Sequence, residues 1–122
     1  MTEQELRDRT KLFARRVLRL AEALPFTRSG RVVAGQLGRA GTSVGANYRA
    51  VCRARSTADF VAKLGLVEEE ADECAFWLEL VIEEAMLPAA RVQPLWAEAD
   101  ALTAIMVSAR RTAGRPLRKA KS

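Results

Sequence analysis

Residues 35–49, GQLGRAGTSVGANYR, are the first candidate for chemistry, because glycine-rich loops can cradle phosphate through their backbone N–H groups. The stretch has neither the GxGxxG pattern nor the lysine and hydroxyl of a GxxxxGKS or GxxxxGKT loop, and no strand precedes it. Residues 35–38 match the GxxG clamp of KH domains, but that clamp needs an α/β domain whose strands this sequence does not offer. The pattern favours a third interpretation, a helix in which the glycines serve close packing.

A run of carboxylates at residues 68–73, EEEADE, is the second candidate. Such groups can bind a metal ion or exchange protons with a substrate. However, the chain has no histidine, which excludes Ser-His-Asp and Cys-His nucleophile systems, His-ligated zinc and the Glu-x-x-His di-iron site. Because consecutive residues point around a helix, the run is more typical of a solvated or salt-bridged face. We expect no catalysis, no cofactor and no metal.

Two cysteines complete the reactive side chains. Cys52 and Cys74 stand 22 residues apart without CxxC spacing. Free cysteine is usually buried and inert, so we expect two buried thiols, with a shared metal or a disulfide as the alternatives.

Charge is strongly segregated along the chain. Residues 1–55 carry a net charge of +8, residues 56–104 carry −9, and residues 105–122 carry +6. Arginine dominates the basic blocks, and its planar fork suits phosphate recognition. Pairing with the acidic middle block, within or between subunits, is the alternative, and the sequence leaves both open. The candidate contacts with nucleic acid or a protein partner are Arg15, Arg16, Arg19, Arg49, Arg53, Arg55, Arg110, Arg111, Arg115, Arg118, Lys119 and Lys121.

Apolar residues spaced three and four apart predict four helices, over about residues 3–24, 30–54, 57–86 and 90–112. Pro25 ends the first pattern, and Ser29 with Gly30 is a plausible cap for the second. Ser56 and Asp59 form a capping box in which the serine hydroxyl binds the Asp59 amide and the carboxylate reaches back to the cap amide.

The spacing also predicts how these helices pack. An apolar repeat that averages 3.5 residues favours a left-handed bundle, and the short connections favour antiparallel neighbours. We therefore expect an all-α, up-down-up-down, left-handed four-helix bundle in one domain over residues 1–113, followed by a basic flexible tail over residues 114–122. Neither the charged start, MTEQELRDR, nor the short apolar run at residues 74–78 suits a signal or a membrane span. We expect a cytoplasmic protein without membrane contact.

Gly38, Gly41 and Gly45 lie on one face of the second predicted helix. Each glycine in a helix costs about 1 kcal/mol relative to alanine, so close packing against another helix must offset the loss. The helix that packs against these glycines belongs either to the same chain or to a second subunit. In the second case, the glycine face would be part of the contact between subunits.

Residues 29–80 carry a resemblance to a known family. The segments SG-x4-GQLGRAGTSVGANYR, RARSTADFVAKL and EEADECAFWLEL resemble the small four-helix-bundle proteins found in intervening sequences of bacterial 23S rRNA genes. Two positions depart from the family pattern, because relatives often carry an acidic residue at Ala50 and a lysine at Glu69. Asn47, polar beside an apolar stripe, has Ser43, Asp59 or a neighbour as its expected hydrogen-bond partner. The positions that we assign to the family motif and its packing are Gln36, Arg39, Ser43, Asn47, Tyr48, Asp59, Phe60, Glu70 and Trp77.

The resemblance implies a bundle that assembles as a ring, commonly a homopentamer, with a mostly undefined biochemical role. A related group serves as accessory subunits for the reverse transcriptases of diversity-generating retroelements, where a basic ring surface is thought to engage the enzyme and nucleic acid. Our main hypothesis is a non-enzymatic, homo-oligomeric scaffold or adaptor without a small-molecule substrate. The alternative is an accessory subunit whose partners are RNA or DNA and a reverse transcriptase.

Overall fold

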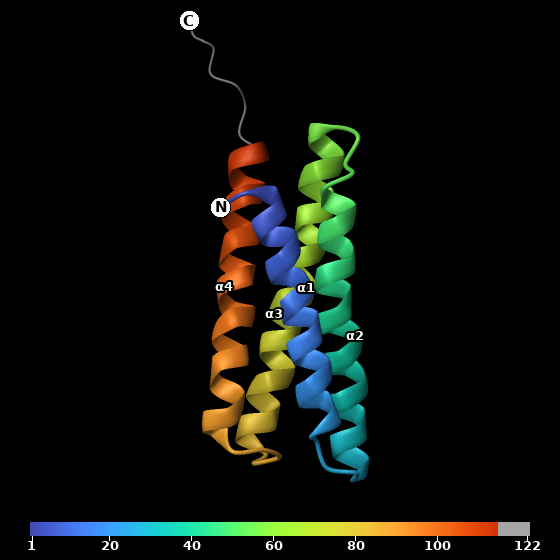
Figure 1. The fold of residues 1–122 in the computed structure, drawn as a ribbon, viewed down its shortest axis with the longest axis vertical. Coiled ribbons are helices and arrows are strands. Elements are labelled where there is room, and N and C mark those ends of the chain that lie inside the picture. Colours follow the sequence, from blue (N-terminus) through green and yellow to red (C-terminus); the bar gives the residue numbers. More distant parts are fainter. Residues whose placement is uncertain (115–122) are drawn as a thin grey trace, which may run out of the picture.

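The computed structural model describes residues 1–114, which form four antiparallel helices (Figure 1). The chain is thus an all-α four-helix bundle, as predicted. Residues 115–122, with the predicted contacts Arg115, Arg118, Lys119 and Lys121, lie outside the described residues. The helices are α1 (Glu3–Glu22), α2 (Arg28–Val51), α3 (Thr57–Glu83) and α4 (Ala89–Gly114).

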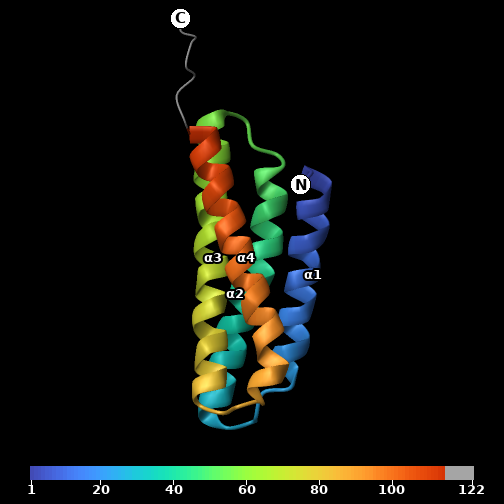
Figure 2. The ribbon, with the colours of Figure 1, turned by 90° about the vertical axis from the view of Figure 1, so that its left-hand side faces the viewer.

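The predicted apolar stripes form the core. Residues without accessible surface include Phe13 of α1, Leu37 of α2, Leu78 of α3 and Met106 of α4. α1 packs along α2, α2 along α3 and α3 along α4, whereas α1 and α4 meet over a much smaller area. α3 and α4 extend beyond the first turn of α1, at the end of the bundle where α2 stops (Figure 2).

Side-chain caps fix three of the helix starts. At α1, the Thr2 hydroxyl accepts from the Glu5 amide at 3.0 Å and the Glu5 carboxylate accepts from the Thr2 amide at 2.7 Å. At α3, Ser56 Oγ accepts from the Asp59 amide at 3.0 Å, as predicted. The Asp59 carboxylate accepts from the amide of Arg55, one residue before the predicted cap amide, at 3.1 Å.

The predicted start of α2 is wrong by two residues. The helix begins at Arg28, because the hydroxyl of Thr27 accepts from the Gly30 amide at 3.0 Å and caps it. Gly30 then lies in the first turn against the preceding loop, where an added Cβ would lie 2.1 Å from the carbonyl oxygen of Pro25.

Helices α1, α2 and α3 end two or three residues before the predicted positions, at residues 22, 51 and 83. The apolar spacing continues past two of these ends because Leu24 and Met86 pack against the core from the connections. Ala85, with φ of 52°, adopts the left-handed conformation that terminates α3. In contrast, α4 starts at residue 89 and continues to Gly114, two residues past its predicted end.

The glycine-rich stretch lies within α2, so the two loop interpretations are wrong and the helical one is confirmed. A Cβ on Gly41 would lie 2.5 Å from Cγ1 of Val17, and a Cβ on Gly45 would lie 3.3 Å from the backbone oxygen of Thr10. Both glycines therefore let α1 of the same chain approach α2, and a second subunit cannot occupy that space. Gly35 differs, since no atom beyond its chain neighbours and the nearby backbone of its own helix lies within 4 Å of its Cβ position.

Candidate interaction surface

A second stripe of residues runs beside the core stripe on both α2 and α3. Residues three and four positions apart share a helix face, and ion pairs across the two helices show that these stripes flank one seam. The α2 stripe is Val32, Gln36, Arg39, Ser43, Ala46 and Ala50, and Arg53 follows in the connection after the helix. The α3 stripe is Asp59, Lys63, Leu66, Glu70, Glu73, Trp77 and Leu80. We call this surface the α2–α3 seam.

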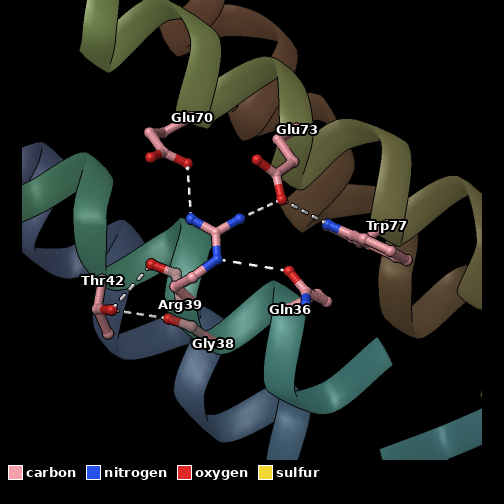
Figure 3. A network of polar contacts seen from close by, with 7 residues as sticks. All are labelled: Gln36, Gly38, Arg39, Thr42, Glu70, Glu73 and Trp77. Atoms are coloured by element: carbon pink, nitrogen blue, oxygen red, sulfur yellow. Dashed lines mark hydrogen bonds and ion pairs between the residues drawn. The ribbon is translucent and has the colours of Figure 1, made fainter. Parts of the chain in front are cut away.

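Arg39 is the centre of the seam (Figure 3). Its guanidinium forms an ion pair with Glu73 and donates to Glu70 Oε1 at 3.4 Å. Trp77 Nε1 donates to the same Glu73 carboxylate at 3.0 Å, and Gln36 Oε1 accepts from Arg39 Nε at 3.4 Å. These bonds lower the pKa of Glu73, with the Trp77 bond as the largest cause, and Glu73 raises the pKa of Arg39. The network joins the two helices, and both of its carboxylates are bound by Arg39.

The other motif residues divide between core and seam. Tyr48 is buried, and its burial raises the pKa of the phenol to about 12. Phe60 packs half-buried against the core. Ser43 and Asn47 are half-buried, and their side chains form no hydrogen bond with other described residues, so the pairing expected for Asn47 with Ser43 or Asp59 is absent.

A basic hollow of about 620 Å³ opens at the end of the seam where α3 begins. We use this name for the site formed by Arg49, Arg53, Arg55, Asp59 and Lys63 over Ala46 and Ala50. Asp59 accepts from Lys63 Nζ at 2.7 Å, and that bond is the largest cause that lowers the pKa of Asp59. The arginines of the hollow form no ion pair with any carboxylate in residues 1–114.

The structure distributes the remaining predicted cations over two other places. Arg16 and Arg19 line a shallow depression with Arg91 at the junction of α1 and α4, and Arg15 is exposed on α1. Near the end of α4, Arg110 Nε donates to Glu68 at 2.8 Å, while Arg111 is exposed. Of the described candidate contacts, only Arg110 pairs with the acidic helix.

The carboxylate run is dispersed around α3. Glu68 faces α4, Glu70 and Glu73 face α2, and Glu69 and Asp72 are exposed. Within residues 1–114, no group of three or more acidic or cysteine side chains is arranged to hold a metal ion. Both cysteines are free thiols. Cys74 is buried, which raises the pKa of its thiol to about 12, whereas Cys52 is only half-buried, contrary to expectation.

Exposed apolar side chains on α2 and α3 are a feature that the sequence analysis missed. Val32 of α2 is 56% exposed, and Leu66 and Phe76 of α3 are 50% and 52% exposed. The Phe76 ring meets Trp77 edge to face, with centroids 5.0 Å apart. The signal was present in the sequence as apolar residues outside the core spacing. We call Val32, Leu66 and Phe76 the apolar ridge.

The family is decided by comparison with known proteins. A family model described as 23S rRNA-intervening sequence protein matches residues 2–108. The chain belongs to the 23S rRNA-intervening sequence protein family. This confirms the predicted resemblance, and the match covers all four helices except the end of α4.

Other comparisons agree on the fold of this 23S rRNA-intervening sequence protein. It is similar to the crystal structure of a protein of unknown function from the S23 ribosomal protein family of Bacteroides thetaiotaomicron, with 30% identity and a TM-score of 0.83. The similarity covers 91% of this chain and 99% of that chain. No curated protein matches. None of the four described helices is long and apolar enough to cross a membrane.

Proposed function

We propose that this protein is a non-enzymatic scaffold that assembles with copies of itself. The observation that carries the proposal is the apolar ridge, where three large apolar side chains stay at least half exposed beside a completed core. Exposed apolar surface is typical of protein interaction sites, and burial of the exposed half of such a side chain stabilises a contact by about 1 kcal/mol.

The surroundings of the ridge favour a contact surface rather than a reaction centre. Glu70 and Glu73, the carboxylates nearest to Trp77 in the network, are occupied by Arg39. A general base needs a pKa near the working pH, but the pKa of Glu73 is lowered.

Replacement of one aromatic residue tests the scaffold. Phe76→Ser removes the largest part of the ridge, so we expect the molar mass measured by light scattering to fall from that of an oligomer toward that of one chain. Phe26→Ser is the matched control, because Phe26 is 88% exposed in the α1–α2 connection and is not one of the three ridge residues. An oligomer that survives Phe76→Ser unchanged contradicts the role of the ridge.

The basic hollow favours a second function, a nucleic-acid-binding accessory subunit, with a reverse transcriptase as one partner. Arg49, Arg53 and Arg55 converge there without ion-pair partners among the described residues. Arginine binds phosphate with a bidentate geometry, and each neutralised phosphate makes affinity fall with salt.

Salt dependence of binding to mixed-sequence single-stranded RNA tests this function. We expect the affinity of the wild type to fall steeply as the salt concentration rises. For a chain with Arg53→Ala and Arg55→Ala, the slope of log affinity against log salt concentration should be smaller in magnitude by about 1 to 2. Arg111→Ala, which changes an exposed arginine of α4 that does not line the hollow, is the control. Undetectable binding at low salt would exclude the accessory role.

A further inference from the structure

The outer face of α1 combines cations with apolar side chains. Lys11, Arg15 and Arg19 are exposed there, and Leu12 and Leu18, on either side of Arg15, are each about half exposed. None of the three cations has an ion-pair partner among the described residues. We call these five residues the basic α1 face.

The outer face of α3 has the opposite charge. Glu69, Asp72 and Glu83 are exposed, and no cation in residues 1–114 pairs with them. Leu66 and Phe76, the α3 members of the apolar ridge, lie on the same outward side. We call these five residues the acidic α3 face.

We propose that the basic α1 face of one copy docks on the acidic α3 face of a second copy, an inference that rests on the proposed scaffold function. The two faces match in composition, with three cations opposite three carboxylates and two apolar side chains on each. Complementary charge sets register and speeds encounter, while buried apolar side chains supply most of the affinity.

The basic hollow is a weaker partner for the acidic α3 face. Its only apolar lining residues are Ala46 and Ala50, and it presents no exposed large apolar side chain to pack against Phe76. The basic α1 face offers two leucines for that purpose. Assembly through α1 therefore leaves the arginines of the hollow accessible to a polyanion.

The position of the faces determines the type of assembly. α1 and α3 lie on opposite sides of the bundle (Figure 2) and do not pack against each other. Each copy therefore offers one face of each kind, and the contact is heterologous. Such contacts continue from copy to copy and close into a ring when the rotation between neighbours permits.

Charge reversal on each side, separately and together, tests the pairing. One variant carries Arg15→Glu and Arg19→Glu, a second carries Glu69→Arg and Asp72→Arg, and a third carries all four changes. We expect the first two to shift to the mass of one chain in light scattering and the third to regain the wild-type mass, because its reversed faces again attract. Arg49→Glu with Arg53→Glu is the charge-matched control that keeps the wild-type mass, and circular dichroism verifies the helix content of every variant.

The outcomes separate the pairing from the scaffold itself. If the wild-type protein has the mass of one chain, both the scaffold and the pairing fail. If the wild type is an oligomer that persists in both two-site variants, or if the four-site variant does not recover the mass, the pairing is wrong and the scaffold function stands.

Discussion

Gly41 shows how a single residue sets the distance between two helices. Its missing side chain lets α1 pack against α2, because a Cβ there would lie 2.5 to 2.7 Å from three atoms of Val17. Real side chains do not tolerate that separation, so alanine at this position must push the helices apart. Gly35, on the same helix, imposes no such constraint.

Alanine substitution at these two glycines should therefore have opposite effects. Gly41→Ala gains about 1 kcal/mol of helix propensity but overpacks the contact, and we expect the free energy of unfolding to fall by about 1–2 kcal/mol. Gly35→Ala adds a methyl group in open space and should raise it by up to about 1 kcal/mol. Urea denaturation measures both. Equal stabilisation by the two substitutions would show that α1 does not approach α2 at Gly41.

Two carboxylates on the α2–α3 seam should make stability depend on pH. The pKa values of Asp59 and Glu73 are lowered in the folded state from ordinary values of 3.8 and 4.5. The stabilisation is therefore fully present above those ordinary values and is lost as the pH falls through the folded-state values. We expect the temperature of the unfolding midpoint to decrease as the pH is lowered from about 5. Asp59→Asn should weaken this pH dependence.

Thermal melts followed by circular dichroism from pH 7 to pH 2.5 make this measurement. Asp100→Asn is the matched control, because Asp100 is exposed and forms no hydrogen bond or ion pair among the described residues. An identical pH dependence in the wild type and Asp59→Asn would contradict the role of the Asp59–Lys63 pair.

At the scale of the elements, apolar spacing predicts the core because one periodic signal selects both the helix and its buried side. Helix ends are harder to predict, since Leu24 and Met86 continue the spacing while they pack from connections. The motif residues could be listed from the sequence, but their common seam could not. Arg39 meets Glu73 only because α2 and α3 run antiparallel at a particular register.

One ion pair, between Arg9 and Glu98, joins α1 and α4 across their small contact. Arg9 Nε and Nη2 each donate to a Glu98 carboxylate oxygen at 2.7 Å, and both side chains are mostly buried. We expect Arg9→Ala to lower the free energy of unfolding by about 1 kcal/mol, because a two-bond guanidinium–carboxylate contact is stronger than most surface pairs. Arg15 lies on the same helix and forms no ion pair among the described residues, so Arg15→Ala should change the free energy of unfolding by less than about 0.5 kcal/mol. Equal effects in urea denaturation would mean that this pair does not hold α1 to α4.

At the scale of the whole molecule, the basic and acidic segments of the sequence form separate basic and acidic surfaces. The basic α1 face and the acidic α3 face lie on opposite sides of the bundle, and the basic hollow lies at the end where α3 begins. The sequence predicts the blocks of charge, but it does not show which charges pair within the chain. Within residues 1–114, most of the exposed arginines form no ion pair, which leaves them for contacts with other molecules.

The mass of the protein in solution tests the central claim most directly. A chain of 13.4 kDa that exposes the apolar ridge and two complementary faces should assemble, so light scattering on the purified protein at micromolar concentration should give a mass of several chains. A mass of 13.4 kDa under these conditions would contradict the account.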